Sequence, residues 1–350
     1  MECWNIVELP SIPVSQYSSI PIFPFLHFNI PFYLYAMRIG LDVMGGDYAP
    51  KAVIAGAVLA MKEFHGGVTL ILIGDKKKIH EELKKFDVSA YKYEIVHAPD
   101  VIGMAESPIK AFTQKPHSSI AVGYHLLMEK KINAFASAGN TGAMLVGAMY
   151  SIKTIPGVIR PCLTSVLPKE SGKVGVLLDI GANADCKPDV LYQFGILGSL
   201  YAEHVYGIKN PKVGLMNIGE EGGKGNLVSQ AAYDIMKSTK QFHFIGNVEG
   251  NDLFNPKADV VVCEGFTGNV IIKQAEAIFE IMSKRHLLDS FFHRFNYEIY
   301  GGSSILGVNG AVVVGHGVSN ESAIKNMIML AKNVAETKLS EKIRNAFIYV

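Results

Sequence analysis

The sequence has few cysteines and almost no excess of charge. Its 350 residues include four cysteines, with no CxxC pair and no metal-ligand spacing, at Cys3, Cys162, Cys186 and Cys263. We therefore expect reduced thiols in a cytosolic protein, with neither disulfide bonds nor structural zinc. Lys and Arg number 33 against 32 Asp and Glu. This balance argues against general nucleic-acid binding, which usually requires a concentrated basic face.

Several common catalytic motifs are also missing. The sequence has no G-x-G-x-x-G fingerprint and no G-x-x-x-x-G-K-[ST] P-loop, so a standard nicotinamide or ATP site is poorly supported. It has no G-x-S-x-G elbow and no H-E-x-x-H pair, which excludes the simplest serine hydrolases and zinc proteases. Nothing in the sequence requires a covalent intermediate.

The first 36 residues differ from the rest. They carry prolines that would interrupt a helix or a central strand, at Pro10, Pro13, Pro21, Pro24 and Pro31. No Lys or Arg precedes Arg38, so the charged region of a signal peptide is missing. Because Met37 directly precedes the first strand-like run, we expect translation to begin there and residues 1–36 to be disordered or not part of the native protein. We predict one catalytic domain over residues 37–350.

From Met37 onward, apolar runs of strand length alternate with segments of helical periodicity. Continuous Val, Ile and Leu runs are typical of a parallel sheet covered by helices on both faces. The sequence therefore predicts a doubly wound α/β protein with a mostly parallel sheet. The expected strands are 39–44, 68–73, 93–96, 134–137, 174–179, 212–217, 242–245, 260–263 and 311–314, and the expected helices include 50–64, 118–130, 188–206 and 226–237.

Glycine-rich turns follow seven of the expected strands: “MGGD”, “SAGNTGA”, “DIGAN”, “NIGEEGGKGN”, “GNVEGND”, “EGFTGN” and “VGHG”. A single turn of this kind needs only a residue that tolerates positive φ. In an open parallel sheet, however, such turns converge outside the carboxyl ends of the strands, where helix N-termini present free N–H groups to anions. We expect a phosphate-bearing ligand or free phosphate there.

Four polar side chains in these turns are candidates for ligand binding. Lys224 lies between glycines, where its ammonium either reaches over a ligand or is simply solvated. Asn140 and Asn269 lie near helix starts, so they either cap helices or donate amide hydrogen bonds to a developing oxyanion. Lys187 precedes a helix-starting proline and would supply a second positive charge for phosphate.

Further candidates have an equally simple structural explanation. Asp42, Asp47 and His316 are acid or base candidates, or else turn and cap residues. Cys186 stands beside Lys187, but no base near it in the sequence supports a nucleophile.

Six segments follow one another in a distinctive order: “MRIGLDVMGGDYAPKAV”, “SAGNTGA”, “LLDIGANADCKP”, “VGLMNIGEEGGKGN”, “FIGNVEGND” and “GFTGNVIIK”. Together they resemble the successive motifs of the bacterial phosphate acyltransferase (PlsX) family, from Met37 to the “GHG” region and beyond. The resemblance implies a three-layer αβα sandwich, similar to phosphate acetyltransferases and to the isocitrate and isopropylmalate dehydrogenases.

The resemblance also implies a reaction. Orthophosphate would attack the thioester carbonyl of an acyl chain on acyl carrier protein, giving acyl phosphate and free carrier for phospholipid synthesis. The family needs no metal or other cofactor, and it implies a homodimer. It points to Lys224 and Asn269 as the central catalytic pair. Further substrate- and phosphate-binding candidates are Gly45, Gly46, Asp47, Asn140, Thr141, Asn183, Lys187, Asn226 and His316.

Two positions depart from the family pattern. Tyr48 stands where the family commonly has histidine, which puts an essential imidazole at that position in doubt. Glu264 stands where aspartate is usual, so the charge is kept with a slightly different reach.

The segment at about 278–300 mixes aromatic, aliphatic and basic residues, a composition typical of an interfacial helix pair. Core or dimer packing is the alternative. In the family this region is commonly longer, projects from the body and is associated with peripheral membrane contact. We predict a cytoplasmic protein with weak, reversible membrane association through a protruding segment, with contact candidates Leu287, Leu288, Phe291 and Phe292.

Three other functions stay open. A phosphate acetyltransferase acting on acetyl-CoA shares the chemistry and differs in the donor. An oxidoreductase of the related dehydrogenase fold would need a nicotinamide and usually a metal, and the sequence carries neither signature. A phosphate- or carrier-binding module would bind without turnover.

Overall fold

The centre of the fold is one large sheet. The computed structural model describes residues 37–64 and 66–348. The strands are β1 (Met37–Asp42), β2 (Val68–Gly74), β3 (Tyr93–His97), β4 (Ala134–Ser137), β5 (Cys162–Pro168), β6 (Val174–Leu178), β7 (Lys212–Met216), β8 (His243–Val248), β9 (Val260–Val262), β10 (Ser303–Leu306) and β11 (Ala311–Val314). Across the sheet their order is β3-β2-β1-β4-β11-β10-β5-β6-β9-β7-β8. The prediction for residues 1–36 lies outside the described residues.

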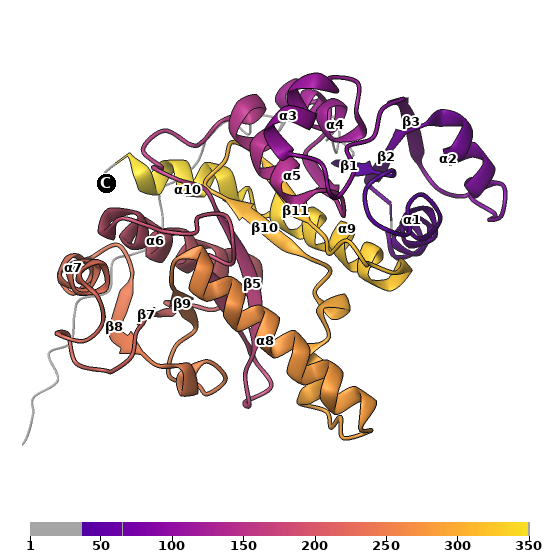
Figure 1. Cartoon of the computed structure of the whole chain (residues 1–350). Helices are drawn as coiled ribbons and strands as arrows, with labels where there is room; N and C mark the ends of the chain where they lie inside the picture. The colour runs from indigo at the N-terminus through magenta and orange to yellow at the C-terminus, as the bar shows by residue number, and fades with distance from the viewer. Residues whose placement is uncertain (1–36, 65, 349–350) are drawn as a thin grey trace, which may run out of the picture. The chain divides into compact units, whose positions relative to one another are not determined.

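Helices lie on both faces of this sheet. They are α1 (Lys51–Glu63), α2 (Lys76–Leu83), α3 (Pro108–Gln114), α4 (Ser119–Met128), α5 (Thr141–Gly147), α6 (Pro188–Tyr206), α7 (Leu227–Met236), α8 (Gly265–Lys284), α9 (Glu321–Glu336) and α10 (Leu339–Phe347). Helix α9 packs on α1 and on strands β1, β4 and β11, and α6 packs on β6, β7 and β9 (Figure 1).

Strand β2 illustrates how the sequence creates two packed faces. Neighbouring side chains of a strand point to opposite faces of the sheet. All seven residues of β2 are buried because a core covers each face. Leu70 and Leu72 join the core that contains α1 and α9, whereas Ile71 and Ile73 join the core that contains α4 and α5. A strand buried on both faces therefore needs a continuous apolar run. Helices on both faces of the sheet confirm the predicted three-layer αβα sandwich.

All nine expected strands are present, within a few residues of their expected ends. The sequence did not predict β5 or β10. Strand β5 contains Thr164 and Ser165 and ends at Pro168, and β10 has only four residues, two of them serine. Neither segment has the long Val, Ile and Leu run that marks a strand by composition alone.

The two missed strands reverse the direction of the sheet. Strand β10 is antiparallel to both β11 and β5, and β5 is antiparallel to β6. These three reversals leave β3, β2, β1, β4 and β11 pointing one way and β6, β9, β7 and β8 the other way. The expectation that all glycine-rich turns share one edge of the sheet is therefore wrong.

Short strands nevertheless bring the two sets of turns together. The end of β11, at Val314, pairs with the start of β10 at Ser303. Strand β10 ends three residues later, beside the start of β5, and β5 pairs there with the end of β6. Four strand residues span only about 13 Å. The carboxyl ends of the two parallel halves therefore lie close to one another across β10 and β5.

On the face of the sheet opposite α6, helix α8 provides only partial cover. Ile271 and Ile272 pack against a small core that contains Leu177 and Val261, but Gly265 and Gly268 are the buried residues of this helix. Much of its apolar surface is exposed, including Phe266. Within the described ranges, no helix combines the length and apolar character needed to cross a membrane.

Candidate active site

A cavity of about 420 Å³ lies where the two halves of the sheet meet. Strands β5 and β10 line it, together with turns from both halves. The start of α5 and the turn after β11 contribute Thr141 and His316, while the turn after β6 and helix α8 contribute Gly181 and Asn269. Ligands of open α/β sheets bind outside the carboxyl ends of the strands. This cavity is therefore the candidate active site.

Three of the predicted site residues line this cavity: Thr141, Asn269 and His316. Asn269 is exposed in the second turn of α8, and its Nδ2 donates to the main-chain oxygen of Ile180 at 3.2 Å. It does not cap the helix, because Glu264 does so by accepting the N–H of Thr267 at 2.9 Å. The capping interpretation of Asn269 is therefore wrong. Glu264, which stands where aspartate is usual, caps the start of α8 instead.

His316 is held between an aromatic ring and a carboxylate. Its ring stacks on Tyr297 with centroids 4.8 Å apart, and its Nε2 lies 4.0 Å from Oε1 of Glu276. Burial lowers the pKa of His316 below its ordinary value, and Glu276 opposes that shift. The imidazole is therefore mainly neutral at pH 7. Its Nδ1 is buried without a hydrogen-bond partner among the described residues.

Sequence reasoning missed Lys273 and Glu276, which also line the cavity. Lys273 Nζ lies 2.8 Å from Oε2 of Glu276. A signal was available in the sequence: positions 269, 273 and 276 are spaced i, i+4 and i+7, so they share one face of a helix. The spacing alone does not show that this face of the helix lines the cavity, because that depends on how α8 lies against the sheet.

The glycines of the opening turn serve packing between turns. A Cβ on Gly45 would come within 2.7 Å of the main-chain nitrogen of Gly139, and Gly46 has a φ of +103°. The N–H of Asp47 donates to the main-chain oxygen of Gly317 at 2.8 Å. These contacts join the turns after β1, β4 and β11. The space beside Gly45 is thus filled by protein, and of this group only Gly317 lines the cavity.

Two buried carboxylates organise the turns, one in each half. Asp42 accepts hydrogen bonds from Ser137 Oγ at 2.7 Å and from the N–H of Met44 at 2.9 Å, and burial raises its pKa. Asp179, which the sequence did not single out, accepts the N–H groups of Leu163 and Asn183 at 2.9 and 2.7 Å. Asp42 is only 1% exposed and does not line the cavity, so the turn-residue interpretation fits it, while an acid or base role stays a prediction.

Asn140 and Asn183 also hold turns in place. Asn140 caps α5 by accepting the N–H of Ala143, which confirms the capping interpretation. Its Nδ2 lies 3.1 Å from each of three main-chain oxygens in the 103–106 loop. Asn183 Nδ2 donates to the main-chain oxygen of Pro161 at 2.8 Å and to Asp179 at 2.9 Å.

Lys224, Lys187 and Asn226 lie in other turns and are not among the residues that line the cavity. Lys224 belongs to the loop between β7 and α7, and its half-exposed Nζ lies 4.0 Å from the Glu221 carboxylate. Asn226 caps α7 by accepting the N–H of Ser229 at 2.8 Å, and Lys187 directly precedes α6. These turns follow β7 and β6, in the same half of the sheet as Asn269.

Nucleophilic cysteine chemistry finds little support at Cys186. Burial raises the pKa of Cys186 to about 12, so its thiol is protonated at neutral pH and is a poor nucleophile. The described cysteines Cys162, Cys186 and Cys263 are free. Within residues 37–64 and 66–348, no group of three His, Cys, Asp or Glu side chains is arranged to hold a metal ion.

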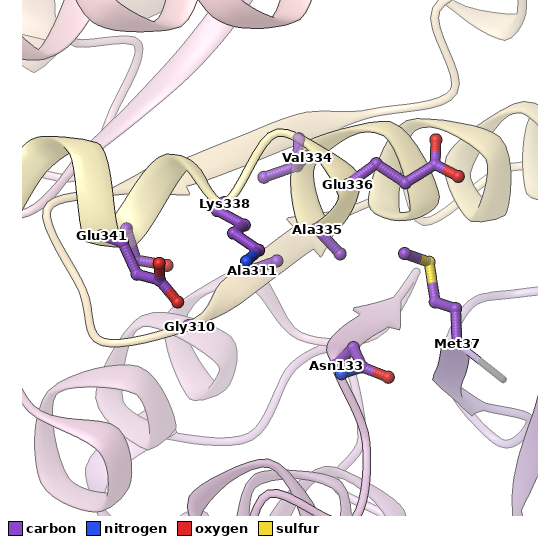
Figure 2. A pocket seen from close by; sticks show the side chains of 10 residues that line it. Met37, Asn133, Gly310, Ala311, Val334, Ala335, Glu336, Lys338 and Glu341 are labelled. Carbon is purple, nitrogen blue, oxygen red and sulfur yellow. The ribbon is translucent and has the colours of Figure 1, made fainter. Parts of the chain in front are cut away.

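A second cavity of about 420 Å³ lies at the opposite ends of the strands (Figure 2). It is lined by Met37 at the start of β1, Asn133 just before β4, and Ala311 at the start of β11. Lys338 and Glu341, near the start of α10, also line it (Figure 2). Because it lies at amino ends of strands and holds none of the predicted residues, it is not the candidate active site.

Known proteins match this chain over most of its length. A family model described as “Fatty acid synthesis protein” matches residues 37–342. The phosphate acyltransferase of Desulforamulus reducens is 44% identical over 328 residues, which cover 89% of this chain and 97% of the relative. That of Dictyoglomus thermophilum is 41% identical over 326 residues, which cover 88% of this chain and 96% of the relative.

Solved structures share the fold at much lower identity. A phosphotransacetylase from Streptococcus pyogenes has a TM-score of 0.62 at 17% identity, and EutD phosphotransacetylase from Staphylococcus aureus has a TM-score of 0.59 at 16% identity. Each comparison covers 85% of this chain and 94% of the other. The chain therefore belongs to the fatty acid synthesis protein family, the family of PlsX acyltransferases that its six motifs resemble.

Proposed function

We propose that this acyltransferase moves the acyl group of acyl-acyl carrier protein to orthophosphate, and so feeds phospholipid synthesis. A phosphate oxygen forms a bond to the thioester carbonyl carbon, the carbon–sulfur bond breaks, and the carrier thiolate takes up a proton. The observation that carries the proposal is the identity of 41–44%, over nearly the whole length, to proteins named phosphate acyltransferase.

The cavity between the two halves is the proposed reaction site. Asn269 would donate its amide to the reacting carbonyl, because preorganised donors stabilise the oxyanion that forms there. Lys224 would bring positive charge from the β7–α7 loop, and Lys187 and Asn226 would support it from the neighbouring turns. Thr141 and His316 would contact phosphate from the first half, while Asp47, Asn140 and Asn183 would keep the turns in register.

We further propose a cytoplasmic homodimer with peripheral membrane contact. Residues 278–300, the end of α8 and the turns that follow it, would form the contact. Leu287 is 53% exposed, which supports a role in such a contact. Phe291 and Phe292 pack on each other and on Phe295, with ring centroids 5.2 to 5.9 Å apart, so they support the segment from within.

A phosphate acetyltransferase is the second candidate. It shares the attack of phosphate on a thioester with the first candidate and differs in the donor, and two phosphotransacetylases share the fold of this chain. At 16–17% identity these structures support the fold alone, so the donor must be determined by measurement.

The full chain should be incubated with palmitoyl-acyl carrier protein or acetyl-CoA, each with and without orthophosphate. Free thiol and acyl phosphate are measured together. We expect both products to appear from the acyl carrier donor only when phosphate is present. Activity with acetyl-CoA alone would support the acetyltransferase, and inactivity with both donors would favour a binding module.

A further inference from the structure

The charges inside the candidate active site are few. Among the described residues that line the cavity, Lys273 and His316 are basic and Glu276 is acidic. Glu276 lies between the other two, with one carboxylate oxygen 2.8 Å from Lys273 Nζ and the other 4.0 Å from His316 Nε2. Because burial lowers the pKa of His316, the ammonium of Lys273 is the main positive charge facing this space.

A phosphate dianion in the cavity needs a cationic partner, since an anion loses its hydration when it enters a site. Lys224 and Lys187 do not line the cavity. Lys273 does, and it stands one helical turn after Asn269 on the same face of α8, where such neighbours have Cβ atoms about 5–6 Å apart. An anion held by Lys273 would therefore lie next to the amide proposed to meet the carbonyl.

The contacts of Lys273 also make it exchangeable. Its side chain is 55% exposed, and its ion pair with Glu276 lies on the helix surface, where such pairs are weak. A bound dianion offers more charge and more acceptor oxygens than one carboxylate.

We infer that Lys273 is a phosphate-binding residue of this enzyme, and that Glu276 holds its ammonium in place until phosphate replaces the carboxylate. This inference rests on the proposed function and deepens it by assigning the acceptor's charge partner. Glu276 then competes with phosphate for the same ammonium. Removing the lysine and removing the carboxylate must therefore change phosphate affinity in opposite directions.

The test compares Lys273→Ala, Lys273→Arg and Glu276→Gln in the full chain, with phosphate varied at saturating palmitoyl-acyl carrier protein and then the donor varied at saturating phosphate. We expect Lys273→Ala to raise KM for phosphate about tenfold or more, with KM for the acyl donor within about twofold. Lys273→Arg should stay within about threefold of wild type, because the charge is kept. Glu276→Gln should lower KM for phosphate.

A matched control lies on the same helix. Lys284 pairs with Glu280 at 3.5 Å, is well exposed and does not line the cavity. Lys284→Ala should leave KM for phosphate unchanged. An unchanged KM in Lys273→Ala, an equal rise in Lys284→Ala, or a rise in both Lys273→Ala and Glu276→Gln would overturn the inference, the last because it indicates a merely structural ion pair.

Direct binding of inorganic phosphate, measured by titration calorimetry, separates this inference from the proposed function. If wild type makes no acyl phosphate, the proposed function fails whatever the variants do. If wild type turns over and Lys273→Ala binds phosphate as wild type does, only the assignment of Lys273 fails. Should Lys273→Ala not fold, Lys273→Gln replaces it in both measurements.

Discussion

The side-chain amide of Asn269 donates a hydrogen bond to the main-chain oxygen of Ile180 over 3.2 Å, across 89 positions of sequence. This bond ties α8 to the turn after β6. It also orients the amide at the wall of a cavity to which both halves of the sheet contribute.

Replacing Asn269 should therefore harm the reaction more than the fold. We expect Asn269→Ala to lower kcat by about 100- to 1000-fold, as loss of one oxyanion donor typically does. Loss of a single exposed hydrogen bond should cost only about 1 kcal/mol of unfolding free energy. Steady-state kinetics and urea denaturation check the two effects. A folded variant with near wild-type kcat would remove Asn269 from the mechanism.

Lys224 provides the second kinetic prediction. Lys224→Ala should lower kcat by about 100-fold or more, because it removes the positive charge proposed to act from the β7–α7 loop. The fold should stay intact, because an exposed loop lysine contributes little to stability. Glu221→Ala is the control, since its carboxylate lies 4.0 Å from Lys224 Nζ, and its rate should stay within about twofold of wild type. Equal losses in both variants would indicate a disturbed loop instead.

Asn140 should matter mainly for stability. It is buried, caps α5 and donates toward three main-chain oxygens, so Asn140→Ala leaves several buried groups without a partner. We expect a loss of about 2–3 kcal/mol in unfolding free energy. Asn226→Ala removes an exposed cap from α7 and should cost about 1 kcal/mol or less. Urea denaturation of both variants decides whether burial makes this difference.

The buried Lys169 should make the free energy of unfolding depend on pH. Its side chain is buried and donates to the main-chain oxygen of Leu253 at 2.7 Å, and burial lowers its pKa from 10.5 to about 8 against the opposing charges of Asp259 and Asp252. Between these two pH values the unfolded chain binds the proton that the folded chain has released, so this group makes stability rise with pH.

Relative to Lys169→Met, wild type should therefore gain up to about 3 kcal/mol of unfolding free energy as pH rises from 8 to 10.5. Below pH 8 both states are protonated, and the difference between the proteins should be constant. Thermal or urea denaturation across this range measures it. Parallel stability curves for the two proteins would show that Lys169 titrates normally.

Membrane contact is tested with Leu287. Leu287→Asp should weaken liposome flotation about tenfold or more, because an exposed leucine gains roughly 1.5–3 kcal/mol when it leaves water. Ile218→Asp is the control, since Ile218 is 80% exposed but lies in the loop after β7. The double change Phe291→Asp with Phe292→Asp is less informative, because both rings pack on Phe295. Flotation that Leu287→Asp leaves unaltered would exclude this segment as the anchor.

Local sequence signals were sufficient for much of the fold. Helix α6 has the expected bounds, because Pro188 begins it and Gly207, in the left-handed region, ends it. Strand β2 is buried on both faces, so only a continuous apolar run suits it. The family likewise follows from six motifs, each of which is read within a few residues.

The direction of the sheet was decided by tertiary structure alone. Strands β5 and β10 meet through contacts such as the N–H of Ser304 with Thr164 Oγ1, 140 positions apart, and nothing local in either segment specifies that pairing. This reversal decides which turns share a cavity. The sequence by itself thus determined the parallel strands, the glycine-rich turns and the acyltransferase family. Only the tertiary structure placed Lys273 beside Asn269 in the cavity and Lys224 outside it, because the position of a charge depends on long-range strand pairing.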